Sequence, residues 1–170
     1  MTRSAFLVLL WSLIAHPLDA QAVLPALIRQ QLSRTFPGWH FATLGADDST
    51  SLPANASPAW IQGNFDGDTH SDYVVQVVTT EGLDSLQRVI AFLGRRDGYM
   101  AALADSFPVS TTAYLVLARA GEERTDFDAD PNGRTHVRLQ HDAVDIVFAE
   151  AAASTCLYRS TGFRCMTSGD

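Results

Sequence analysis

The sequence contains no lysine, and this absence narrows the classes of partner that the chain can bind. All 12 basic residues are therefore arginines, and 19 acidic residues outnumber them, so the formal net charge is −7. Binding to nucleic acids or to anionic membranes needs clustered positive charge. The composition argues against both of these partners, and its acidity favours cations.

Cysteine is scarce too, since only Cys156 and Cys165 occur. If Ser160 and Thr161 form a two-residue hairpin loop, Cys156 lies directly opposite Cys165. The Cα atoms of such a non-hydrogen-bonded pair are about 4.5 Å apart, which a disulfide can close. If Gly162 instead takes the left-handed position of a three-residue loop, the register slips by one residue and the bond is more strained. In either register we expect a disulfide.

Long apolar segments are missing as well, except at the N-terminus. There, Arg3 precedes an apolar run at residues 5–15, and the small-residue pattern Ala20-Gln21-Ala22 follows. These are the three parts of a secretory signal peptide, and the run is too short to remain as a membrane anchor. We expect residues 1–22 to be removed and residues 23–170 to be periplasmic or secreted.

The motifs of common catalytic sites do not occur in the sequence. There is no Gly-x-Ser-x-Gly, no His-Glu-x-x-His and no glycine-rich phosphate loop. The histidines are scattered, and His136 and His141 would point to opposite faces of a strand at residues 135–140, so they cannot chelate one metal. We therefore expect that the protein is not an enzyme.

Apolar periodicity predicts one helix near the start of residues 23–170. Leucine, isoleucine and phenylalanine recur at spacings of three and four residues from Leu24 to Phe36, with Pro25 in the first turn and Pro37-Gly38 as the stop. Residues 45–58 are rich in Asp, Ser, Ala and Pro, which is typical of an exposed loop.

The rest of the chain has the pattern of short strands separated by turns. The segment 73–78 is apolar at neighbouring positions, which predicts a central strand buried on both faces. One helix followed by many strands favours a single α+β domain at residues 23–170, an N-terminal amphipathic helix followed by a mainly antiparallel β-sheet. The other expected strands are residues 39–44, 88–93, 99–104, 113–118, 135–139 and 144–148 and the cysteine hairpin.

The most informative segment runs from Gly63 to Asp72, because it offers oxygen atoms at alternate residues. Calcium takes six to eight oxygen ligands, and loops that wrap around it supply them at alternate positions with a backbone carbonyl at the seventh. Gly67 permits the tight turn between the second and third ligands. The expected ligands are Asn64, Asp66, Asp68, the His70 carbonyl and Asp72.

This spacing resembles the Asp-x-Asp-Gly-Asp-x-x-x-Asp calcium loops of the FG-GAP and integrin-type (VCBS-like) repeats. The resemblance implies one calcium ion bound just ahead of a β-strand, and here Asp72 leads directly into Tyr73-Val74-Val75. The loop departs from the family pattern because Asn64 replaces the first aspartate, which removes one charge. It also occurs once, which excludes a complete propeller. A solvated Asp-Gly turn, whose aspartates cap backbone amides, is the alternative.

A second acidic stretch, residues 126–133, matches only the first half of an EF-hand loop. Asp128, Asp130 and Asn132 fit, but the twelfth position is Leu139. The turn sequence Pro131-Asn132-Gly133 favours an exposed turn over a second ion site.

The C-terminal region and the Asp-rich loop together resemble small exported bacterial proteins of unassigned function. We expect a non-enzymatic periplasmic or secreted domain that binds one calcium ion through the Asp-rich loop. The alternative is a protein-binding module, such as an inhibitor or immunity protein of an envelope hydrolase, because acidic exported domains with a rigid hairpin suit that task.

Overall fold

The computed structural model describes residues 23–45, 52–82, 84–128, 135–149 and 152–169. The expected signal peptide, residues 1–22, lies outside these ranges.

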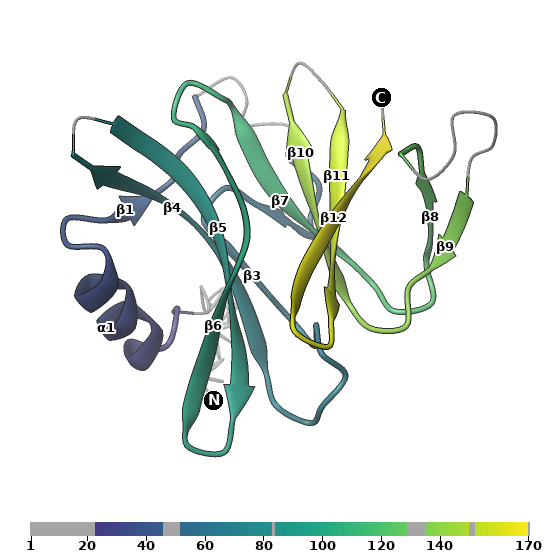
Figure 1. Ribbon diagram of the computed structural model, residues 1–170, viewed down its shortest axis with the longest axis horizontal. Helices are drawn as coiled ribbons and strands as arrows, with labels where there is room; N and C mark the ends of the chain where they lie inside the picture. Colours follow the sequence, from purple (N-terminus) through teal and green to yellow (C-terminus); the bar gives the residue numbers. More distant parts are fainter. Residues whose placement is uncertain (1–22, 46–51, 83, 129–134, 150–151, 170) are drawn as a thin grey trace, which may run out of the picture.

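The described chain consists of one helix and three antiparallel sheets (Figure 1). The helix is α1 (Ala26–Thr35). The first sheet contains β1 (His40–Phe41), β3 (Trp60–Gly63), β4 (Asp72–Glu81), β5 (Asp84–Arg95) and β6 (Gly98–Pro108). The second contains β2 (Ala56–Ser57), β7 (Ala113–Ala118), β10 (Ala143–Phe148), β11 (Ala153–Arg159) and β12 (Gly162–Gly169). The third is the pair β8 (Glu123–Asp126) and β9 (Thr135–Arg138).

The expected α+β class is wrong, because the chain has a β-rich fold. Within the described residues α1 is the sole helix, with 10 residues, whereas 12 strands form three sheets. The apolar periodicity located this helix correctly, but one short amphipathic helix covers only part of one sheet face. The main core lies between the first and second sheets, and this sheet-on-sheet packing determines the class.

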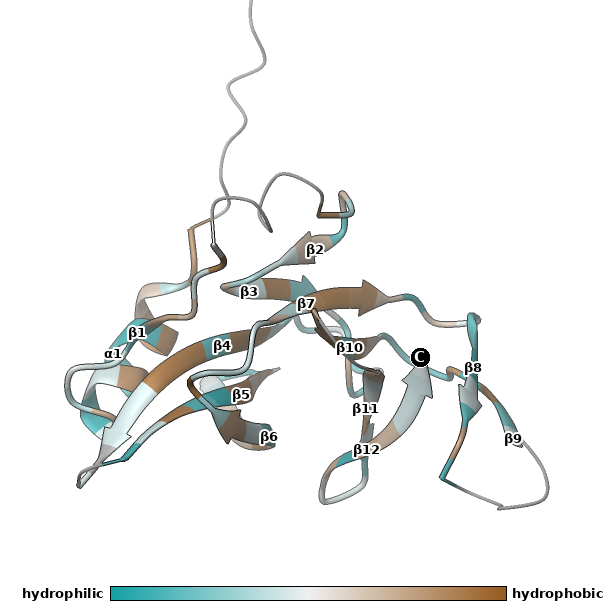
Figure 2. Ribbon diagram, turned by 90° about the horizontal axis from the view of Figure 1, so that it is seen from above, coloured by the Kyte–Doolittle hydropathy of each residue, from teal (hydrophilic) through white to brown (hydrophobic). Residues whose placement is uncertain are grey.

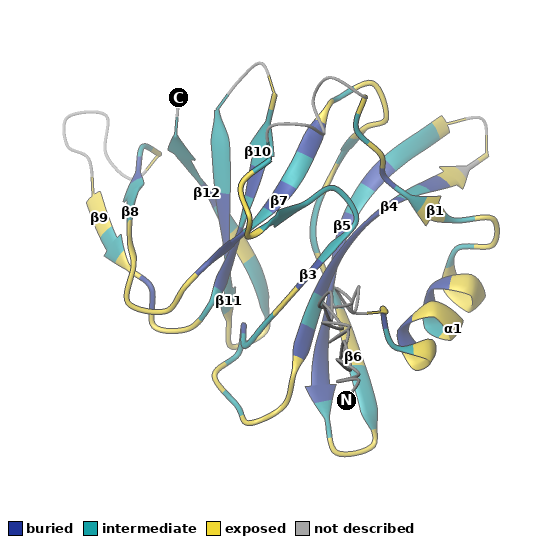
Figure 3. Ribbon diagram, turned by 180° about the vertical axis from the view of Figure 1, so that it is seen from behind, coloured by how far each residue is buried: buried dark blue, intermediate teal, exposed yellow. Residues whose placement is uncertain are grey.

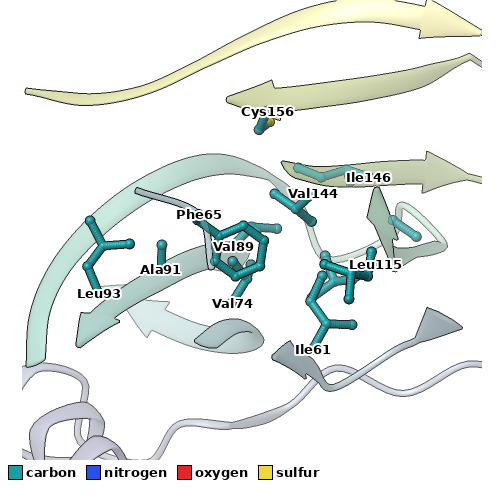
Figure 4. Packing of buried hydrophobic residues seen from close by; sticks show 12 residues of the cluster. Ile61, Phe65, Val74, Val89, Ala91, Leu93, Leu115, Val144, Ile146 and Cys156 are labelled. Atoms are coloured by element: carbon teal, nitrogen blue, oxygen red, sulfur yellow. The ribbon is translucent and has the colours of Figure 1, made fainter. Parts of the chain in front are cut away.

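The first sheet is central because its strands place apolar side chains on both faces. On one face, Val74 and Val89 pack in the main core with Leu115 and Ile146 of the second sheet (Figure 4). On the other face, Val75 and neighbouring residues pack against the helix segment. This confirms the prediction of a buried central strand at residues 73–78, and Figure 2 shows the hydrophobic band along β4. The helix-side cluster consists of Leu24, Ile28, Leu32, Val75, Val77, Ile90 and Phe92.

The expected disulfide is present, and the structure decides between its two registers. Arg159 pairs with Gly162 across a two-residue loop, and Cys156 pairs directly with Cys165. The two cysteine Cα atoms are 3.9 Å apart. Cys156 is fully buried in the main core. The bond therefore joins β11 to β12 at the edge of the second sheet.

Strands that are neighbours in the sequence pair with each other in some cases only. Strand β4 pairs with β5, and β5 pairs with β6. Strand β7, however, pairs with β10, and β9 pairs with β8 rather than with β10. These assignments depend on which apolar faces meet in the core, and the local sequence does not encode that choice.

Candidate metal centre

The Asp-rich segment forms the loop between β3 and β4. Gly63 at the end of β3 pairs with Asp72 at the start of β4, so the two ends of the loop are held together. Asp72 therefore begins the following strand, as the sequence indicated. Figure 3 shows this loop as largely exposed, next to the buried strands β4 and β5.

Side-chain groups of the loop bind its own backbone and give it a defined shape. Asn64 Oδ1 accepts a hydrogen bond from the Gly67 N–H at 2.8 Å, and Asn64 Nδ2 donates to the Asp68 carbonyl at 2.6 Å. Asp66 Oδ1 accepts from the Asp68 N–H at 3.2 Å, and Asp68 Oδ1 accepts from the His70 N–H at 2.6 Å. Gly67 has a φ of 79°, which glycine adopts readily.

Three carboxylates of the loop converge on one region of space. One oxygen from each of Asp66, Asp68 and Asp72 lies within 4.8 Å of the other two. Grouped carboxylate oxygens are the ligands that hard divalent cations prefer, so this group could hold a metal ion. Of the other two expected ligands, Asn64 contacts Gly67 and Asp68, while the His70 Nδ1 lies 3.1 Å from Asp68 Oδ2.

Asp72 is the deepest member of the group, with no solvent exposure. Its Oδ2 accepts a hydrogen bond from the Phe65 N–H at 2.8 Å, and its Oδ1 accepts from the Gly94 N–H at 2.7 Å. Burial raises the pKa of Asp72, although the Gly94 and Phe65 N–H groups act in the opposite direction. A cation close to this carboxylate would offset the cost of burying its charge.

Arg95, at the end of β5, supplies a positive charge to the same group. Its Nη1 lies 2.7 Å from Asp66 Oδ2 and 3.2 Å from Asp68 Oδ2. The hydrogen bond to Asp66 raises the pKa of Arg95 further above its usual value. The His70 N–H, for its part, lowers the pKa of Asp68. One guanidinium thus faces three carboxylates, and two negative charges remain in excess.

Segments far away in the sequence hold the loop in place. The Asn64 N–H donates to Asp142 Oδ2 at 3.1 Å, and the Asp142 N–H donates back to the Asn64 carbonyl at 3.0 Å. The imidazole of His141 covers Gly67 so closely that a Cβ at this glycine would collide with the ring. A Cβ on Gly94 would lie 2.7 Å from the Ser71 carbonyl oxygen. The β9–β10 segment and β5 are therefore both in close contact with the loop.

Three further residues belong to this site and were not expected from the sequence: Arg95, Asp142 and His141. For Arg95 the missing information is the β4–β5 register, in which Tyr73 pairs with Phe92, so that the end of β5 lies beside the loop. For Asp142 and His141 no local signal exists, since they lie in the connection between β9 and β10, two strands that belong to other sheets than β3 and β4.

The second acidic stretch is only partly described, because residues 129–134 lie outside the described ranges. Asp126 is buried, and its Oδ1 accepts from the Asp128 N–H at 3.0 Å. Asp128 Oδ2 accepts from the Thr167 N–H at 2.8 Å, and this hydrogen bond lowers the pKa of Asp128. The described carboxylates of this stretch are thus bound to backbone groups.

Comparison with known proteins identifies no relative of this chain. No family model matches the chain, and no curated protein or solved structure is significantly similar to it. Within the described ranges, no helix combines the length and apolar character needed to cross a bilayer. The disulfide is compatible with an oxidising, extracytoplasmic compartment.

Proposed function

We propose that this protein is an exported, non-enzymatic domain that binds one calcium ion in the β3–β4 loop. The observation that carries the proposal is the convergence of three carboxylates, one of them completely buried. The proposed ligands are Asn64, Asp66, Asp68, the His70 carbonyl and Asp72.

Electrostatics supports a divalent cation at this point. Two carboxylates at the 4.8 Å limit of the group repel each other by about 3 kcal/mol at an effective dielectric near 20. Arg95 compensates one of the three negative charges, and a divalent ion would compensate the remaining two. Side-chain and carbonyl oxygens on a loop favour calcium over zinc, which prefers sulfur and nitrogen ligands.

Thermal unfolding of the purified protein with calcium and with a chelator tests this proposal. A ligand at 100 times its dissociation constant stabilises the folded state by about 2.7 kcal/mol, which raises the midpoint by roughly 8 °C. We expect Asp68→Asn to reduce this calcium-dependent shift strongly. Asp97→Asn is the matched control, because Asp97 lies in the exposed β5–β6 turn. Equal midpoints of the unchanged protein in the two conditions would contradict calcium binding.

The variant Arg95→Gln distinguishes a calcium site from an internally neutralised ion-pair cluster. Without calcium, the loss of Arg95 leaves three carboxylates without their cation, so the midpoint in chelator should fall. With calcium, the ion no longer meets the repulsion of a nearby guanidinium, so the calcium-dependent shift should grow. Arg96→Gln serves as the control, because the neighbouring Arg96 is exposed in the turn. A fall that calcium does not reverse would favour the ion-pair cluster.

Support for a non-enzymatic role comes from how the carboxylates are engaged. Both oxygens of Asp72 accept backbone N–H groups, and Asp66 and Asp68 bind Arg95. These contacts fix the positions of the three carboxylates, as metal ligation requires. They also leave none of the three carboxylates free to act as a general base. A hydrolytic activity lost in the Asp68→Asn variant would contradict this part of the proposal.

The alternative of a protein-binding module makes a different prediction. An inhibitor or immunity protein should co-purify from an envelope extract with one stoichiometric hydrolase, and it should do so in chelator as well as in calcium.

A further inference from the structure

A cavity of about 290 Å³ lies beside the carboxylate group. Three segments line it: residues 65–66 of the β3–β4 loop, residues 137–142 around the end of β9, and residues 157–160 at the β11–β12 turn. In Figure 1 these segments gather at the lower end of the molecule. The volume is close to the lower limit of sites that bind small molecules.

Apolar side chains form part of the lining of this cavity. Phe65 and Leu139 line it and are 1% and 3% exposed, and the partly buried Leu157 lies with them. These side chains belong to the packed interior, so the floor of the cavity is fixed by the core. Of these three side chains, Leu157 offers the apolar surface that a ligand can contact.

The rim, in contrast, carries positive charge that other described residues do not neutralise. Arg138 and Arg159 both line the cavity and are exposed. Within the described ranges, neither guanidinium has an ion pair or a side-chain hydrogen bond. Arg119 and Arg124, in contrast, form ion pairs with Asp142 and Asp145. Two unpaired arginines at one cavity are notable in a chain with a net charge of −7.

The acidic residues at the same cavity are already engaged. Asp66 is bound by Arg95, and Asp142 accepts from Arg119 and from the Asn64 and Ala120 N–H groups. Both carboxylates therefore have partners other than Arg138 and Arg159. A ligand at this rim meets two free guanidinium groups, which suit the planar oxygen pairs of carboxylates and phosphates.

We propose that this cavity binds a small organic anion. Its carboxylate or phosphate group is held by Arg138 and Arg159, and its apolar part lies against Leu157. This site goes beyond calcium binding, because its anion-binding residues are not members of the carboxylate group. Asp66 alone belongs to both sites.

Titration calorimetry with defined probes tests the proposal in chelator and in calcium. The probes are benzoate and phenyl phosphate, with benzyl alcohol as the neutral analogue and inorganic phosphate as the anion without an apolar part. We expect saturable binding of benzoate or phenyl phosphate in both conditions, and none of benzyl alcohol. Because a hydrogen bond to a charged group contributes about 1.5–3 kcal/mol, Arg138→Gln and Arg159→Gln should each weaken binding about tenfold or more.

Arg164→Gln is the matched control, because Arg164 is exposed on β12 and does not line the cavity. The absence of saturable binding up to about 10 mM of both aromatic anions, or binding that persists in the double variant of Arg138 and Arg159, would overturn the proposal. Equal affinity for inorganic phosphate and phenyl phosphate would contradict the proposal that an apolar part of the ligand contributes to binding. If anion binding required calcium and its affinity were unchanged in both arginine variants, the anion would be bound by the metal ion and not by the arginines. Failure of calcium binding with intact anion binding would refute only the calcium proposal.

Discussion

Asp72 shows how one buried residue links the candidate metal centre to the stability of the fold. Its carboxyl group has no solvent exposure and meets two backbone N–H groups from different parts of the chain, Phe65 and Gly94. Burial raises its pKa in the folded state. The folded protein therefore holds a proton on Asp72 more tightly than the unfolded chain does, and ionisation of this group opposes folding.

The raised pKa of Asp72 makes the stability of the protein depend on pH. In chelator, its contribution to stability is fully present below its unfolded-state pKa of about 3.9 and is lost as the pH rises through the raised folded-state pKa. Relative to Asp72→Asn, the unchanged protein should therefore lose stability as the pH rises above about 4. Urea unfolding between acidic and neutral pH measures this difference.

The Asp72→Asn variant will also be less stable by a constant amount, about 1–3 kcal/mol, because its NH₂ group meets a backbone N–H. The slope with pH is therefore the informative quantity. Carboxyl groups with a lowered pKa, such as Asp128, change stability in the opposite sense. They are present in both proteins, so their effect cancels in the comparison. Parallel pH profiles would contradict the role given to Asp72, and calcium should remove the loss at neutral pH.

At the scale of elements, two hairpins shape the region around the candidate sites. The β4–β5 hairpin brings Gly94 and Arg95 to the Asp-rich loop, because β5 extends beyond Phe92, the residue that pairs with Tyr73. The β11–β12 hairpin carries Tyr158 to Ser160 to the cavity and is closed by the disulfide. The cysteine pair therefore stabilises an element that also forms one wall of the anion cavity.

We predict a modest loss of stability when this disulfide is removed. The bonded cysteines are separated by 9 residues, and closing so short a loop stabilises the folded state by about 2–3 kcal/mol in the chain-entropy treatment. Urea unfolding of the double variant Cys156→Ala and Cys165→Ala should show a loss of this size. Reductant should destabilise the unchanged protein similarly and leave the double variant unaffected. Insensitivity of both proteins to reductant would show that the bond does not contribute.

At the scale of the whole molecule, the layers explain why the candidate sites lie at one end. The helix covers part of one face of the first sheet, and the second sheet packs against the other. Both broad faces of the first sheet are thus used for packing. The β3–β4 loop, the β9–β10 segment and the β11–β12 turn lie beyond these packed faces, where their polar side chains remain accessible.

For the chain as a whole, we predict that it is exported and that the mature protein begins at Val23. The reason is the charged, apolar and small-residue pattern of residues 1–22. Expression in a bacterium, fractionation and intact-mass measurement test it, with a chain lacking residues 1–22 as the control. The exported form should contain the disulfide, and the control should remain reduced in the cytoplasm. An intact N-terminus at Met1 in the cytoplasmic fraction would contradict export.

Features that depend on neighbours in the sequence could be predicted well. The spacing from Leu24 to Phe36 located the helix, the apolar segment 73–78 indicated a central strand, and the two-residue loop at Ser160 and Thr161 was one of two registers considered. The fold class could not be derived in this way. A strand pattern states that a segment is extended, but it does not state which sheet the strand joins, and so β7 and β9 were not assigned to their partners.

The sequence by itself determined the oxygen-bearing residues of the Asp-rich loop and the turn at Gly67, because alternate side chains and glycine torsion angles are properties of a short segment. Only the tertiary structure decided that Asp72 is buried, that Arg95 faces Asp66, and that Arg138 and Arg159 share a cavity. These facts depend on sheet register and on the meeting of distant segments. Contacts of that kind are selected by the packing of the complete core, which no local pattern contains.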